Sequence, residues 1–89
     1  MKTRVKYRFG YMTKPLNIVG PRVRKLRYSK GLSQAKLAEK CQVKGWDITR
    51  EGIAKIEGQV RHVDDREIVY LCKVLSVKPE VLLGIATKR

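Results

Sequence analysis

Five short apolar stripes at helical spacing constrain this chain most strongly. Each stripe is bounded by a capping residue or a glycine and is about three helical turns long or shorter. A helix of this length can bury its apolar face only against other helices. Four stripes contain Val19, Val23 and Leu26; Leu37, Ala38 and Cys41; Ile53 and Ile56; and Ile68, Leu71, Cys72 and Leu75. The fifth is a run of three consecutive residues, Val81, Leu82 and Leu83, in the short helix expected after Pro79. A chain of 89 residues has room for one core. The pattern predicts an all-α domain of five helices that share this core.

Signals at the helix ends set the expected bounds. The residues expected at the helix starts are good caps or a proline: Asn17, Ser33, Thr49, Asp64 and Pro79. Glycines are expected to end four helices, at Gly31, Gly45, Gly58 and Gly84. We assign Val43 to the buried face of the second helix and attribute Gly52, inside the third, to the close approach of a backbone. The expected domain spans residues 17–85, with a short basic tail at 86–89.

Positive charge dominates the N-terminal half of the chain. The net charge is +13, from 21 Lys and Arg against 8 Asp and Glu, and no acidic residue precedes Glu39. Such an excess causes self-repulsion in a small fold, which favours a polyanionic partner. We expect nucleic acid rather than a membrane surface, and the alternative is a basic surface that only keeps the protein in solution.

Residues 1–16 form a basic N-terminal extension. Basic residues alternate with Val, Tyr and Phe from Arg4 to Phe9, a period that predicts a strand. A strand without a partner is not stable. The extension is therefore expected to be disordered, to lie along DNA, or to pair with its copy in a dimer.

Several classes of function find no support in the residues. Cys41 and Cys72 fall on apolar stripes, which predicts reduced core thiols, and His62 alone makes no metal or catalytic site. We expect no enzyme activity, no cofactor and no small-molecule substrate. No apolar run is long enough for a membrane span or a secretory signal, so we expect a cytoplasmic protein.

The stretch from Gly31 to Glu57 carries the informative motif. Gly31-Leu32-Ser33-Gln34, Leu37-Ala38-Glu39-Lys40 and Ile53-Ala54-Lys55-Ile56-Glu57 resemble the Cro/CI-type (lambda repressor-like, XRE) helix-turn-helix family. The resemblance covers about residues 17–84. It implies a compact five-helix lambda repressor-like domain that binds double-stranded DNA sequence-specifically and acts as a transcriptional regulator, namely a repressor.

The resemblance also implies roles for individual residues. Arg50 would grip guanine, Glu51 would accept from cytosine, and Ala54 would touch a thymine methyl group. Gln34 would contact phosphate and buttress the third helix, while Thr49 and Lys55 complete the DNA-facing set. Arg61 and His62, in the loop after that helix, are candidates for phosphate contact. Arg27 and Glu57 match a structural pair that ties the first helix to the third.

One departure from the family pattern concerns the connection before the third helix. Seven positions usually separate the residues equivalent to Cys41 and Ile53, whereas twelve do here. The five extra residues fall between Gln42 and Asp47, and we expect them to add a turn to the second helix and to lengthen the connection. Trp46, within this insertion, is expected to fill core rather than to read DNA.

Two other functions remain open from the sequence. The same fold serves as an interaction module, such as an antitoxin or an adaptor, and a basic chain can coat nucleic acid without reading it.

A regulator of this size is expected to form a homodimer, because two reading helices double the length of the site. Apolar residues near Leu82, Leu83 and Ile85 are the candidates for that contact.

Overall fold

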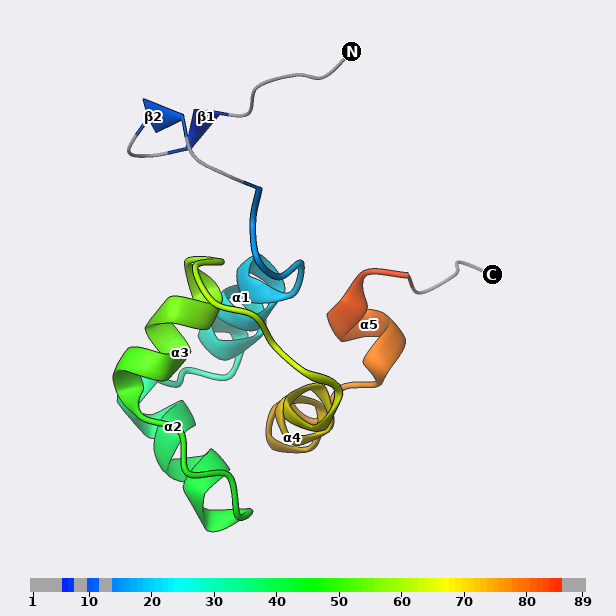
Figure 1. The fold of residues 1–89 in the computed structure, drawn as a ribbon. Coiled ribbons are helices and arrows are strands. Elements are labelled where there is room, and N and C mark those ends of the chain that lie inside the picture. Colours follow the sequence, from blue (N-terminus) through cyan, green and yellow to red (C-terminus); the bar gives the residue numbers. More distant parts are fainter. Residues whose placement is uncertain (1–5, 8–9, 12–13, 86–89) are drawn as a thin grey trace.

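Five helices carry the domain in a computed structural model that describes residues 6–7, 10–11 and 14–85. They are α1 (Gly20–Ser29), α2 (Gln34–Val43), α3 (Arg50–Glu57), α4 (Asp65–Leu75) and α5 (Pro79–Leu83) (Figure 1). Two strands of two residues each, β1 (Lys6–Tyr7) and β2 (Gly10–Tyr11), precede them. The predicted all-α class of the domain is confirmed. No helix in the described part of the chain has the length and apolar content needed to cross a membrane.

The strands correct one expectation. β1 pairs antiparallel with β2, so that Lys6 lies opposite Tyr11 and Tyr7 opposite Gly10. A single strand without a partner in its own segment was expected, and this was wrong, because its partner follows in the same extension. The other residues of the strand expected from Arg4 to Phe9 lie outside the described residues.

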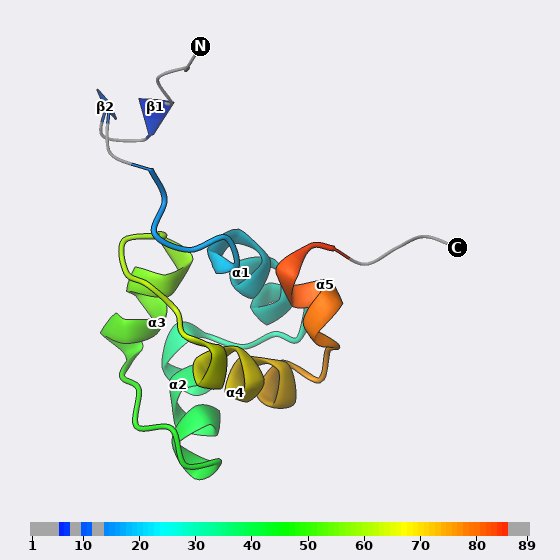
Figure 2. The same ribbon diagram turned by 45° about the vertical axis from the view of Figure 1, so that its right-hand side comes forward.

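All five helices contribute to one core. Figures 1 and 2 show α3 at one edge of the domain, packed on α1 and α2, with α4 and α5 toward the opposite edge. Every predicted stripe buries side chains, and those without solvent exposure are Val23, Leu37, Cys41, Ile53, Ile56, Leu71, Leu75 and Leu82. Cys41 and Cys72 are buried free thiols, as expected, and burial raises the pKa of Cys41 to about 11. One assignment to the core was wrong. Val43, expected on the buried face of the second helix, is 81% exposed.

The expected caps of three helices are present. Ser33 Oγ accepts from the backbone N–H of Lys36 at 3.0 Å, and Thr49 Oγ1 accepts from that of Gly52 at 3.1 Å. Asp64 and Glu67 form a reciprocal capping box at the start of α4. These bonds satisfy backbone donors that have no partner inside a helix.

The first helix begins later than expected, at Gly20 instead of near Asn17. Pro21 has no N–H to donate to the carbonyl of Asn17, and the first helical bond runs from Val23 N to Val19 O at 2.8 Å. Asn17 still behaves as a cap, because its Oδ1 accepts from Gly20 N at 2.8 Å.

The buried side chain of Asn17 also joins the start of α1 to the end of α3. Its Nδ2 donates to the carbonyls of Ile56 and Arg61 at 3.1 and 2.9 Å. In return, Gln59 Nε2 donates to the Asn17 carbonyl at 2.9 Å. The backbone N–H of Leu16 donates to the carbonyl of Gln59 at 3.0 Å. Four hydrogen bonds therefore fix the segment before α1 against the segment that follows α3.

Two glycines within helices lie where neighbouring atoms leave no room for a side chain. A Cβ at Gly20 would fall on the carbonyl oxygen of Ile56 and would press on that of Glu57, so the backbones of α1 and α3 touch here. At Gly52 the neighbour is the side chain of Ile48, with Cγ1 2.6 Å from where a Cβ would lie. The expectation of a backbone at Gly52 was therefore wrong. The backbone contact is at Gly20.

The substitution Gly20→Ala tests this contact. Its methyl group would push α1 away from α3, and we expect the free energy of unfolding to fall by about 1–3 kcal/mol or more, as for other overpacked sites. Urea denaturation monitored by circular dichroism measures the change. The control is Gly58→Ala, where the Cβ would lie 3.3 Å from one carbonyl oxygen of its own helix. Equal losses for the two variants would contradict the contact.

Candidate nucleic-acid interface

The outer face of α3 is open. Ile53 and Ile56 are fully buried and fix the inner face of the helix on the core. The side chains of Arg50 and Glu51 are 57% and 71% exposed, and Lys55 is also exposed. Ala54 is half-buried between them. α3 therefore presents a short row of polar side chains on a rigid, buried base.

Arg50 and Glu51 are free to take other partners. Arg50 Nη2 lies 3.7 Å from Glu51 Oε2, and an exposed pair at this distance stabilises a fold by about 1 kcal/mol at most. The guanidinium offers two parallel N–H donors, and the carboxylate offers acceptors. The helix thus combines a donor fork, an acceptor and the methyl group of Ala54, which are the chemical types that read base edges.

Thr49 sits at the start of this row. Its Oγ1 accepts the capping bond from Gly52 N, so its hydroxyl proton points elsewhere. Because the residue is exposed, that proton is available to an acceptor outside the protein. A hydroxyl and a helix N-terminus at one point favour a phosphate oxygen.

One buried carboxylate holds α3 to its two neighbours. Glu57, the last residue of α3, receives two bonds from Arg27 of α1: Nε to Oε2 at 2.7 Å and Nη2 to Oε1 at 3.0 Å. Gln34 Nε2 of α2 donates to Oε1 at 3.0 Å. Arg24 Nε, also from α1, approaches Oε1 at 3.4 Å. The expected pairing of Arg27 with Glu57 is therefore present. It belongs to a cluster that also contains Gln34 and Arg24.

The charges of this cluster perturb one another. Burial of Glu57 opposes ionisation, but the hydrogen bonds from Arg27 and Gln34 outweigh it and lower the pKa of the carboxyl group. The bond to Glu57 raises the pKa of Arg27. The pair therefore stays ionised although both side chains are at least nine-tenths buried. A buried ion pair is stable only when its hydrogen bonds offset the loss of water around the charges.

Two expected phosphate contacts have partners within the protein. Gln34 is half-buried and donates to Glu57. Arg61 Nη2 donates to Glu67 Oε2 of α4 at 2.8 Å, and its Nη1 is buried with no hydrogen-bond partner among the described residues. About 30% of the Arg61 side chain is exposed, and His62 beside it is exposed. The structure thus places Gln34 beneath α3 and turns Arg61 toward α4.

The insertion before α3 is tied down at both ends. α2 runs only two residues past Cys41, about half a turn, and not the full turn expected. It closes when Trp46 N donates to the Cys41 carbonyl and Gly45 takes a φ of 108°. Gln42 Nε2 then donates to the carbonyl of Ile48 at 2.7 Å.

Trp46 packs within the domain. Its ring stacks on that of Tyr70 in α4, with centroids 5.7 Å apart, and it lies half-buried against the core. The expectation that this residue fills core is confirmed. The longer connection therefore rests on α4 and does not swing free in front of α3.

Two residues support the site through contacts that sequence reasoning missed. Arg24 contacts Glu57 from one turn before Arg27, and a second basic residue on that face was the available signal. Asn17 was identified as a cap, but nothing local indicated its bonds to Ile56 and Arg61.

The variant Glu57→Gln tests the carboxylate cluster. It leaves the buried Arg27 without a countercharge, and we expect a loss of about 3–5 kcal/mol in the free energy of unfolding at pH 7. Because folding lowers the pKa of Glu57, the native state gains this stability above the usual glutamate pKa of about 4.3 and loses it as the pH falls through the lowered value. Urea denaturation at pH 7, 5 and about 3 should therefore give a flatter profile for the variant. Glu39→Gln, in an exposed pair with Lys36, is the control, and an equal effect there would count against the cluster.

Comparisons with known proteins agree with this architecture. The restriction-modification controller protein C.AhdI from Aeromonas hydrophila is 33% identical, with a TM-score of 0.65 over 75% of this chain and 90% of that one. The DNA-binding domain of BldD is 25% identical, with a TM-score of 0.66 over 81% of this chain and 99% of that one. The clp gene regulator ClgR from C. glutamicum, at 17% identity and a TM-score of 0.67 over 86% of this chain and all of that one, shares the fold.

No protein-family model and no curated protein sequence matches the chain. The similarity to C.AhdI extends over nearly the whole of that protein. The chain belongs to the Cro/CI-type (XRE) helix-turn-helix family.

Proposed function

We propose that this protein is a sequence-specific, double-stranded DNA-binding transcriptional regulator, and that it acts as a repressor. The observation that carries the proposal is the open face of α3, where Arg50, Glu51 and Lys55 are exposed above the buried Ile53 and Ile56. A major groove admits one such helix. C.AhdI is a controller protein, and the matched part of BldD is a DNA-binding domain, which supports the proposal.

The proposed mechanism divides the site between bases and phosphates. Arg50 binds guanine through two hydrogen bonds, Glu51 accepts from cytosine, and Ala54 contacts a thymine methyl group. Phosphates are bound by Thr49, Lys55, Arg61 and the second amide proton of Gln34, and they fix the register of the helix. Repression follows where the site overlaps a promoter.

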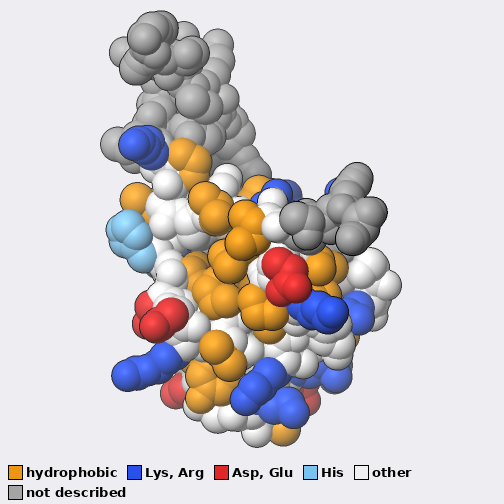
Figure 3. Space-filling view, turned by 90° about the vertical axis from the view of Figure 1, so that its right-hand side faces the viewer, with side chains coloured by type: hydrophobic (Ala, Val, Ile, Leu, Met, Phe, Trp, Pro, Cys, Tyr) orange, Lys and Arg blue, Asp and Glu red, His pale blue; other side chains and the backbone are white. Residues whose placement is uncertain are grey.

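The protein is proposed to act as a homodimer in the cytoplasm, without catalytic activity. Figure 3 shows hydrophobic side chains gathered on the face that carries α4 and α5. Among the residues near α5, Ile85 is 67% exposed, Val81 is 40% exposed and Leu83 is half-buried. Leu82 is fully buried and belongs to the core. A second copy that covers Val81, Leu83 and Ile85 would place two α3 helices on one duplex, as a two-fold site requires.

Selection from random duplexes at fixed salt tests the function. We expect a preferred sequence, and we expect Arg50→Ala to weaken binding to it by about 1–3 kcal/mol and to relax preference at one base pair. Fluorescence anisotropy measures the affinities. Arg66→Ala, an exposed arginine of α4, is the matched control. If wild-type protein binds random and selected duplexes equally, the protein coats DNA and the proposal fails.

The substitution Ile85→Glu tests the dimer. A charge on the apolar α5 surface should convert the dimer to a monomer and weaken binding to a two-fold site by at least about tenfold. Sedimentation equilibrium measures the mass. Val60→Glu, at a valine that is 52% exposed after α3, should leave the mass unchanged. A monomeric wild-type protein would contradict this contact.

A further inference from the structure

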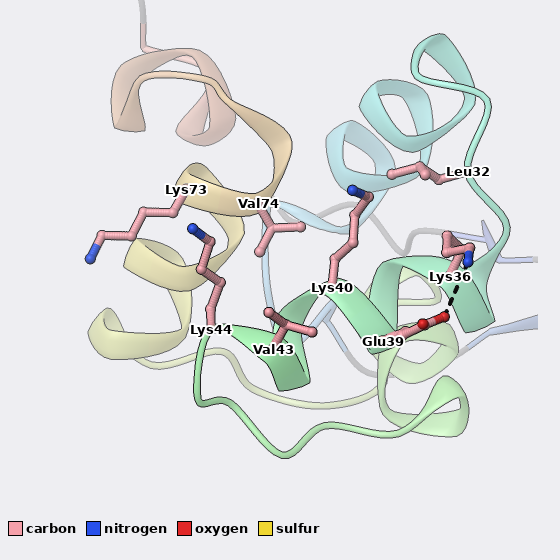
Figure 4. A pocket seen from close by; sticks show the side chains of 8 residues that line it. All are labelled: Leu32, Lys36, Glu39, Lys40, Val43, Lys44, Lys73 and Val74. Atoms are coloured by element: carbon pink, nitrogen blue, oxygen red, sulfur yellow. Dashed lines mark ion pairs between the residues drawn. The ribbon is translucent and has the colours of Figure 1, made fainter.

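A groove between α2 and α4 carries four lysines above an apolar floor. Its volume is about 450 Å³, and its lining residues are Leu32, Lys36, Glu39, Lys40, Val43, Lys44, Lys73 and Val74. We call it the α2–α4 groove. None of its lining residues belongs to α3, and Figure 4 shows α2 between the groove and the fainter ribbon of α3. A ligand in the groove therefore leaves the open face of α3 clear.

The charge of the groove is one-sided. Lys36 and Lys40 of α2 and Lys44, which caps its end, follow one another every four residues, and Lys73 faces them from α4. Glu39 forms an ion pair with Lys36 at 3.2 Å. Within the described residues no carboxylate forms an ion pair with Lys40, Lys44 or Lys73. Three ammonium groups around one hollow favour a ligand that brings carboxylates.

The floor of the groove is apolar and accessible. Val43 is 81% exposed, although it lies on a helix whose buried face is complete without it. In Figure 4 the side chains of Val43 and Val74 approach each other, with Lys40 and Lys44 on either side. Val74 and Leu32 are half-buried. Apolar side chains of a partner would cover this floor and remove it from water.

The two features together select the kind of partner. A DNA backbone offers charge to the lysines but little apolar surface for Val43, whereas an acidic protein segment with leucine-like side chains offers both. We propose that the α2–α4 groove binds an acidic, amphipathic segment of a partner protein. The inference rests on the proposed function in one respect, namely that the protein binds this segment while α3 is engaged with DNA.

The test uses a synthetic peptide as the probe. It is a fluorescein-labelled peptide of about 14 residues, with glutamates at all positions except i, i+3, i+4 and i+7, where leucines share one face when the peptide forms a helix. Anisotropy titrations with the full chain are run at about 0.15 M salt, where exposed charges more than about 8 Å apart are screened. Titrations are repeated with the protein bound to a duplex. A second peptide replaces every leucine by glutamine and keeps the charge.

We expect saturable binding of the leucine peptide, about tenfold weaker binding of the glutamine peptide, and the same affinity on the duplex complex. Lys40→Glu and Val43→Ser should each weaken binding of the leucine peptide about fivefold. Lys25→Glu and Val60→Ser change an exposed lysine and an exposed valine outside the groove, and they should change little.

Four results would overturn the proposal. They are no binding, equal binding of the two peptides, equal effects of Lys25→Glu and Lys40→Glu, and displacement of the peptide by the duplex, which would assign the groove to DNA. A selection that returns no preferred sequence would overturn the proposed function but leave the peptide titrations intact, so the two failures are distinguishable.

Discussion

The carboxylate of Glu57 is the group on which the position of α3 depends. It lies at the end of α3 and accepts hydrogen bonds from Arg27 of α1 and from Gln34 of α2. One side chain therefore joins three helices at a point that water does not reach. Apolar packing by Ile53 and Ile56 holds the helix against the core but leaves its rotation and slide weakly defined. The directed bonds to Glu57 supply that definition.

α2 separates two surfaces with different chemistry. Its inner side supplies Leu37, Ala38 and Cys41 to the core, and its first residue, Gln34, supports α3. Its other side carries Lys36, Lys40 and Val43 of the α2–α4 groove. The insertion that follows α2 stacks Trp46 on α4, so the longer connection strengthens the joint between α2 and α4. The inserted residues therefore pack toward α4 and not against the outer face of α3.

Local signals predicted most of the architecture. Apolar spacing identified the inner faces of all five helices, and short-range side-chain bonds at Ser33, Thr49 and Asp64 defined three helix starts. Contacts between distant segments were not readable, because nothing near Gly20 in sequence reveals the carbonyl of Ile56. Val43 was misplaced, since an apolar residue in the last turn of a helix can point either way. Gln59, and not Gly58, takes the left-handed conformation after α3, for which a glutamine gives no warning.

The backbone contact at Gly20 has a consequence for how the protein meets a duplex. α3 is pressed against α1 with no intervening side chain, so it has little freedom to tilt or to be remade on contact. A helix that is already ordered before it meets DNA loses little conformational entropy when it binds. Any misfit between protein and groove must then be taken up by the nucleic acid, through bending or a change in groove width. Stiff and pliant base steps would be distinguished even where no side chain reaches them.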